Sequence, residues 1–192
     1  MDDLSHARQQ RWQRLVMQLQ QEYLALPQAE KGWISLRLQE LERLQQALDS
    51  LFRKAGGETA CAGCEGACCA KGHNHMLLPN LLAYLQQGQL PPTADFSQTC
   101  PWLGAKGCLH GVVLRPYNCV TFLCATLEER LSSEDVEEFY RLDRELRLCY
   151  LSFTEHYAGG GMSGLLIQAE RLAGRPFLET PSRSRQPQQE PI

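Results

Sequence analysis

Apolar residues recur at helical spacing near the start of the chain, with glutamine and arginine on the opposite face. This spacing predicts a helix from Asp2 to about Leu26, which Pro27 ends because proline cannot continue the hydrogen-bond ladder. The apolar positions are Trp12, Leu15, Val16, Leu19, Tyr23 and Leu26.

A second apolar stripe steps by threes and fours from about Ala29 to Lys54, before Gly56 and Gly57 stop it. Its members are Ile34, Leu38, Leu41, Leu44, Leu48, Leu51 and Phe52. We expect the two helices to pack as an antiparallel hairpin. Three heptads are few for a coiled-coil seam, so core packing is favoured over a dimer contact, and the oligomeric state is left open.

Helical spacing returns later in the chain. A short helix is expected around Asn80 to Gln87, and another from Ser163 to Leu172 after a glycine break. Ser132 and Ser133 precede two acidic residues and predict the start of a long helix. Its apolar face carries Val136, Phe139, Leu142, Leu146, Cys149 and Phe153.

The predicted fold class is mainly α, with an N-terminal helical hairpin and C-terminal helices around a loop-rich, cysteine-ligated metal module. The hairpin takes residues 1–55 and the cysteine module 56–130. The C-terminal helices that pack on the module take 131–179. Proline, serine, glutamine and charge dominate 180–192, which predicts a disordered tail.

Composition narrows the function classes. Of 192 residues, 43% are apolar and 21% charged, as in ordinary globular proteins, and the net charge of −3 argues against a broad nucleic-acid surface. Charges and glutamines interrupt each apolar stretch before it reaches the length of a signal peptide or membrane span. We therefore expect a cytoplasmic protein with no nucleic-acid or membrane partner. A protein partner is possible through the helical hairpin.

Eight of the nine cysteines lie in the segments CAGCEGACC, CPWLGAKGC and RPYNCVTFLC. In a reducing cytosol, clustered cysteines are metal ligands or redox groups more often than structural disulfides. Closely spaced pairs supply two thiolates from one turn, and distant segments complete the shell. The candidate ligands are Cys61, Cys64, Cys68, Cys69, Cys100, Cys108, Cys119 and Cys124.

The metal itself stays open between an iron–sulfur cluster and zinc. An all-sulfur donor set and the proline after Cys100 are compatible with iron–sulfur ligation, and two four-thiolate zinc sites would use the same residues. His73, His75 and His110 flank the cysteines and would each be able to replace a thiolate, although a solvated loop histidine is the commoner case. Cys149 belongs to an apolar helix face and is left out of the site.

Three other readings of the cysteines are weaker. Eight thiols would pair evenly as disulfides only in an oxidising compartment. The Cys61–Cys64 pair has the CxxC spacing of redox enzymes, but no strand precedes it. The CxxCxxxC order from Cys61 to Cys68 reverses that of radical S-adenosylmethionine enzymes.

Lys71, Lys106 and Arg115 are near enough in sequence to the cysteines to compensate the negative charge of their thiolates.

The segments CAGCEGACC, CPWL and RPYNCVTFLC resemble those of the CxxCxxxCC cysteine-cluster proteins, the YkgJ-type family. The resemblance covers about Cys61 to Cys124 and includes the Arg115-Pro116 pair, while Val120 stands where the family usually has arginine. It implies a zinc- or iron-chelating protein, often one with an iron–sulfur cluster. A related module occurs in flagellin lysine methylases.

Three functions follow in order of preference. The first is a metal-binding protein that holds an iron–sulfur cluster for electron transfer, sensing or structure. The second is a zinc module for protein contacts. The third is an enzyme related to the protein-lysine methylases, which ranks last because no glycine-rich strand–loop–helix for the methyl donor is present.

Overall fold

The computed structural model describes residues 3–63, 72–105 and 107–180 of the chain. Its first two helices are α1 (Asp3–Ala25) and α2 (Gln28–Lys54), with Pro27 at the N-cap of the second. Both predicted helices are confirmed, with ends within one residue of those expected.

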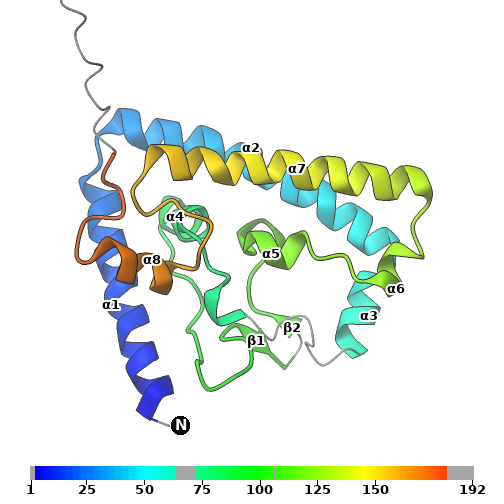
Figure 1. Ribbon diagram of the computed structural model, residues 1–192, viewed down its shortest axis with the longest axis horizontal. Helices are drawn as coiled ribbons and strands as arrows, with labels where there is room; N and C mark the ends of the chain where they lie inside the picture. Colours follow the sequence, from blue (N-terminus) through cyan, green and yellow to red (C-terminus); the bar gives the residue numbers. More distant parts are fainter. Residues whose placement is uncertain (1–2, 64–71, 106, 181–192) are drawn as a thin grey trace, which may run out of the picture.

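The longest pairing in the molecule joins α2 to α7 (Ser133–His156) (Figure 1). The Ser132 hydroxyl caps α7 as predicted, because its oxygen accepts the backbone N–H of Asp135 at 3.2 Å. Lys54 at the end of α2 lies 2.6 Å from Asp135 at the start of α7. At the opposite end Glu30 lies 2.8 Å from His156, so the two helices run antiparallel.

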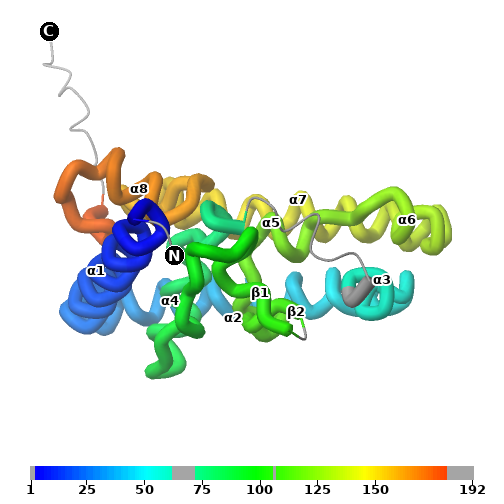
Figure 2. The backbone as a smooth tube through the Cα atoms, turned by 90° about the horizontal axis from the view of Figure 1, so that it is seen from below, coloured from blue at the N-terminus to red at the C-terminus, as the bar shows by residue number. Residues whose placement is uncertain are grey.

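The N-terminal pair does not form the expected antiparallel hairpin, because α1 diverges from α2 at their junction (Figure 1). It packs instead on α4 (Leu78–Gln86) and α8 (Leu165–Leu172). Arg11 of α1 forms a 2.6 Å ion pair with Glu170 of α8. Figure 2 shows α1 and α8 together at one end of the molecule, with α3 and α6 at the other. The physical reason is that α7 covers the leucine stripe of α2.

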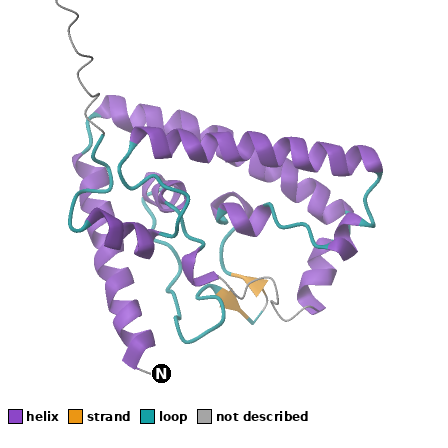
Figure 3. Ribbon diagram, viewed as in Figure 1, coloured by secondary structure: helices purple, strands orange, loops and turns teal. Residues whose placement is uncertain are grey.

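The segment between α2 and α7 contains short elements (Figure 3). The helical ones are α3 (Gly57–Gly63), α4, the 3₁₀ turn η2 (Val112–Leu114), α5 (Tyr117–Val120) and α6 (Ala125–Glu128). A two-stranded antiparallel hairpin, β1 (Leu103–Gly104) and β2 (Gly107–Cys108), interrupts them. The pattern analysis predicted α4 but neither strand. In the described residues the fold is therefore mainly helical, as expected.

One apolar core holds these elements together. It includes Leu19 of α1, Leu44 of α2, Leu82 of α4, Leu146 of α7 and Leu165 of α8. The core therefore crosses the boundaries expected near residues 56 and 131, and the helices and the cysteine segment share it. None of the described helices is both long and apolar enough to cross a membrane. The predicted tail lies outside the described residues from position 181 onward.

Candidate metal centre

Five of the eight candidate ligands lie in the described part of the chain. Cys61 is in α3, Cys108 is in β2 and Cys119 is in α5, while Cys100 and Cys124 stand just before β1 and α6. The elements that carry or follow these residues lie on the same side of the α2–α7 pair (Figure 1). The other three candidates, Cys64, Cys68 and Cys69, lie outside the described residues.

Of the five described candidates, Cys100 is the buried one, with 9% of its surface exposed. Burial raises the pKa of its thiol, and a charge on nearby Cys108 raises it further. The backbone N–H groups of Trp102 and Leu103 lower this pKa in part, against the larger effect of burial. The Leu103 N–H donates to the Cys100 carbonyl oxygen at 3.1 Å and closes the turn at 100–103.

Gly72 lies against this turn. A Cβ atom built on Gly72 would be 2.5 Å from Cys100 Sγ and 3.1 Å from its Cα. No side chain fits there without displacing Cys100, so glycine permits the close approach. The segment that follows Gly72 is thereby held beside the buried thiol.

The β1–β2 hairpin places Cys108 opposite Leu103 and Gly107 opposite Gly104. Gly107 has a φ of +107°, which only glycine adopts without strain. The hairpin returns the chain toward Cys100 within eight residues. Cys108 itself is exposed, so its thiol is accessible from solvent.

Cys119 is in contact with His75, which lies 44 positions earlier in the chain. Its Sγ is 3.4 Å from the Nδ1 atom of the imidazole. Burial lowers the pKa of His75, which favours the neutral ring that can ligate a metal. This pair is the clearest convergence of two candidate donors from different segments.

A buried amide network fixes the backbone just before Cys119. The side-chain amides of Gln45 and Asn80 donate to the carbonyl oxygen of Arg115, at 2.7 Å and 3.0 Å. Asn80 also donates to the Tyr150 hydroxyl at 2.9 Å. Sequence analysis missed these residues, although a polar side chain within an apolar helical stripe is a usable signal.

A second anchor holds the first turn of α5. The Tyr117 hydroxyl donates to the Asp143 carboxylate at 2.6 Å, and its pKa is raised to about 12, first by burial and then by that carboxylate. The ring of Tyr117 packs edge-on against Tyr150. Cys119, two residues later, therefore projects from a backbone that α2, α4 and α7 hold in place.

The three flanking histidines have different surroundings. His73 uses both ring nitrogens, because Arg8 donates to Nδ1 at 3.0 Å and Nε2 bonds the Gln98 carbonyl at 2.6 Å. His110 is only 3% exposed, and its Nδ1 shares a 2.7 Å hydrogen bond with the Tyr84 hydroxyl. Its Nε2 has no hydrogen-bond partner among the described residues. Burial, then the Arg115 charge, lowers the pKa of His110 to about 4.

The described residues do not complete a metal site. Within 3–63, 72–105 and 107–180, no group of three His, Cys, Asp or Glu side chains is arranged to hold an ion. Nor does a disulfide join any two cysteines of this part of the chain. Cys149 lies on α7, half-buried against the core as predicted, and burial raises its pKa.

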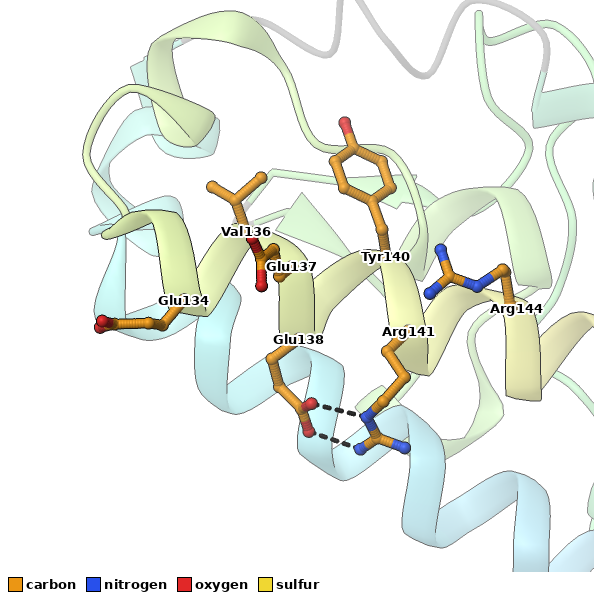
Figure 4. A pocket seen from close by; sticks show the side chains of 7 residues that line it. All are labelled: Glu134, Val136, Glu137, Glu138, Tyr140, Arg141 and Arg144. Atoms are coloured by element: carbon orange, nitrogen blue, oxygen red, sulfur yellow. Dashed lines mark hydrogen bonds and ion pairs between the residues drawn. The ribbon is translucent and has the colours of Figure 1, made fainter.

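A surface hollow on α7 offers no alternative site. Its lining comes from one helix, and Glu138 and Arg141 pair with each other across it (Figure 4). Residues of a single helix face solvent there without converging on a common point. In the cysteine region, by contrast, Cys119 and His75 approach each other from separate segments.

Comparisons with known proteins leave the family of this chain unassigned. No protein-family model matches it, and neither the curated proteins nor the solved structures contain a match.

Proposed function

We propose that this chain is a metal-binding protein whose cysteine thiolates hold an iron–sulfur cluster, with zinc as the alternative metal. The ligands are drawn from the eight candidate cysteines, and the chain is a member of the YkgJ-type cysteine-cluster family. The bound metal cross-links the cysteine segments of the 56–130 region, in addition to the apolar core that this region shares with the long helices. The metal serves electron transfer, sensing or structure, and the protein is located in the cytoplasm.

The environment of Cys100 carries the proposal. Cys100 is buried, Gly72 lies directly against its sulfur, and the β1–β2 hairpin brings Cys108 back toward it. The backbone N–H groups of Trp102 and Leu103 lower the pKa of this thiol against the larger effect of burial, and the thiolate is the form that ligates metal. Because burial opposes that charge, a bound cation would stabilise the thiolate at this position.

The donor chemistry fits both metals. Thiolates are soft ligands that select zinc and iron–sulfur clusters over magnesium or calcium. Burial, and then a charge on Cys108, raises the pKa of Tyr84 to about 12, which agrees with a hairpin that brings this thiol near α4. Cys68 and Cys69 precede Gly72 by four and three residues in the sequence, and Gly72 touches Cys100.

The test is elemental analysis of protein purified without oxygen, with iron, acid-labile sulfide and zinc measured per chain. Iron and sulfide in near-equal amounts, with a broad visible absorption band, are expected for the cluster. Stoichiometric zinc in colourless protein would select the alternative. Wild-type protein that contains neither metal would overturn the proposal.

Two cysteine variants sharpen this test. C100S, which changes a buried thiol, is expected to lose most of the metal. C149S, which changes a half-buried thiol outside the proposed ligand set, should retain it. Circular dichroism checks that both variants fold. C108S changes an exposed position and keeps the test usable if C100S does not fold. Equal metal loss in C149S and C100S would show that the effect is not ligand-specific.

A further inference from the structure

We propose that His75 and Cys119 are ligands of the same metal ion, so that one centre of this protein has a mixed nitrogen and sulfur shell. The inference rests on the proposed metal-binding function and adds a histidine to the ligand set. The observation behind it is the 3.4 Å separation between Cys119 Sγ and His75 Nδ1.

This separation agrees with shared coordination. In a tetrahedral zinc site the metal lies about 2.3 Å from a thiolate and about 2.0–2.1 Å from an imidazole nitrogen. With a tetrahedral angle between the bonds, the two donor atoms are about 3.6 Å apart. A small adjustment therefore brings both atoms onto one ion. Iron in a cluster also accepts histidine in place of cysteine.

Both donors are held in place by the fold. The backbone N–H of His75 bonds the Gly72 carbonyl at 3.1 Å, and the next residue, Met76, accepts the N–H of Leu165 at 2.9 Å. Cys119 follows the carbonyl of Arg115, which the two buried amides fix. A metal would thus bind two donors that the fold already holds close together, so that little further ordering accompanies binding.

The other two histidines serve as comparisons. Both ring nitrogens of His73 are engaged by Arg8 and Gln98, and Nδ1 of His110 is engaged by Tyr84. Among the described residues, His75 is the one of these three whose ring nitrogen lies within hydrogen-bond distance of a candidate cysteine sulfur. A neutral imidazole in place of a thiolate also removes one negative charge from the ligand shell, which lessens repulsion among the thiolates.

An ordinary hydrogen bond between the thiol and the imidazole would give the same separation, and experiment must distinguish the two. X-ray absorption at the zinc or iron edge of the metal-loaded wild-type protein counts nitrogen and sulfur neighbours. We expect an imidazole contribution. A shell of sulfur alone overturns the inference while leaving the proposed function intact.

Variants provide the second readout. H75N is expected to weaken metal retention against a chelator by about tenfold or more. Mutation of a residue that only hydrogen-bonds to a metal ligand already costs about tenfold in affinity, and loss of a ligand should cost at least as much. H75C should restore retention with an all-sulfur shell. H73N, two residues away, is the matched control and should retain metal as the wild type does.

The outcomes separate the two proposals. Wild-type protein without metal refutes the proposed function and this inference together. Wild-type protein that loads metal, with H75N unchanged in retention and absorption, refutes only the role of His75. Should H75N fail to fold, H75C and the wild-type absorption edge still decide.

Discussion

The carboxylate of Glu30, in the first turn of α2, lies 2.8 Å from Nε2 of His156 in the last turn of α7. The same oxygen accepts the Tyr157 hydroxyl at 2.7 Å, and Trp33 stacks on the His156 ring. These bonds lower the pKa of Glu30, that from Tyr157 most and that from His156 next. The Glu30 carboxylate therefore links α2 to the C-terminal end of α7.

Replacing this carboxylate should expose its contribution to stability. E30Q is expected to lower the free energy of unfolding by about 1–2 kcal/mol at pH 7, because hydrogen bonds to a charged acceptor are lost. Since the folded pKa lies below the unfolded one, the contribution is complete above a pH of about 4.3 and disappears as the pH falls through the folded value. The difference between wild type and E30Q should therefore shrink on acidification.

Urea unfolding at pH 7, 5 and 3 measures this difference. E42Q is the control, because Glu42 lies on the same helix, is exposed and bonds only the Gln46 side chain in the described structure. It should unfold like the wild type. A stability difference for E30Q that stays constant from pH 7 to pH 3 would contradict the assignment.

The helices could be predicted from local sequence signals, whereas the pairing of the helices could not. Pro27 was predicted to end the first helix and Ser132 to begin the long third one, each by its own backbone or side-chain chemistry, and both predictions are confirmed. An apolar stripe shows that a face is buried but not what covers it. The stripe of α2 suited α1 and α7 equally, and the structure places α7 on it.

The candidate donor residues could be named from the sequence, whereas the contacts between them could not. The three cysteine segments are visible in the sequence, whereas the approach of Cys119 to His75 depends on two segments 44 residues apart. Gln45 and Asn80 sit among leucines, where a polar residue looks like an interruption. Their partner is a backbone carbonyl at Arg115, and a backbone group carries no sequence signal.

Asn80 should contribute more to stability than its neighbour Tyr150. N80L keeps the number and branching of the side-chain heavy atoms but leaves the Leu77 N–H and the Tyr150 hydroxyl without their bonds. We expect a loss of about 2–3 kcal/mol, because unsatisfied buried groups keep their full desolvation cost. Y150F removes one of these bonds and should cost about 1 kcal/mol. Chemical denaturation of both variants and of the double variant measures this; equal losses would show that Asn80 acts through Tyr150 alone.

Two glycines should respond oppositely to alanine. A Cβ on Gly164 would lie 2.4 Å from the backbone oxygen of Asn74, so G164A must displace the segment that carries His75. We expect a loss of about 1–3 kcal/mol from this overpacking. Gly32 in α2 has nothing within 4 Å of its ideal Cβ, and G32A should stabilise by up to about 1 kcal/mol. Thermal unfolding compares them, and a neutral G164A would contradict the close approach.

Thiol labelling should separate the cysteines by burial and by metal. In reduced, chelator-treated protein the exposed Cys108 should react with iodoacetamide faster than Cys100, whose burial shields the sulfur and raises its pKa. Metal loading should slow both reactions, because a coordinated thiolate is no longer a free nucleophile. Cys149 is outside the proposed ligand set, so its rate should be the same with and without metal. Peptide mass spectrometry gives each rate. If Cys108 is labelled equally fast in loaded and stripped protein, it does not ligate the metal, and the hairpin positions Cys100 alone.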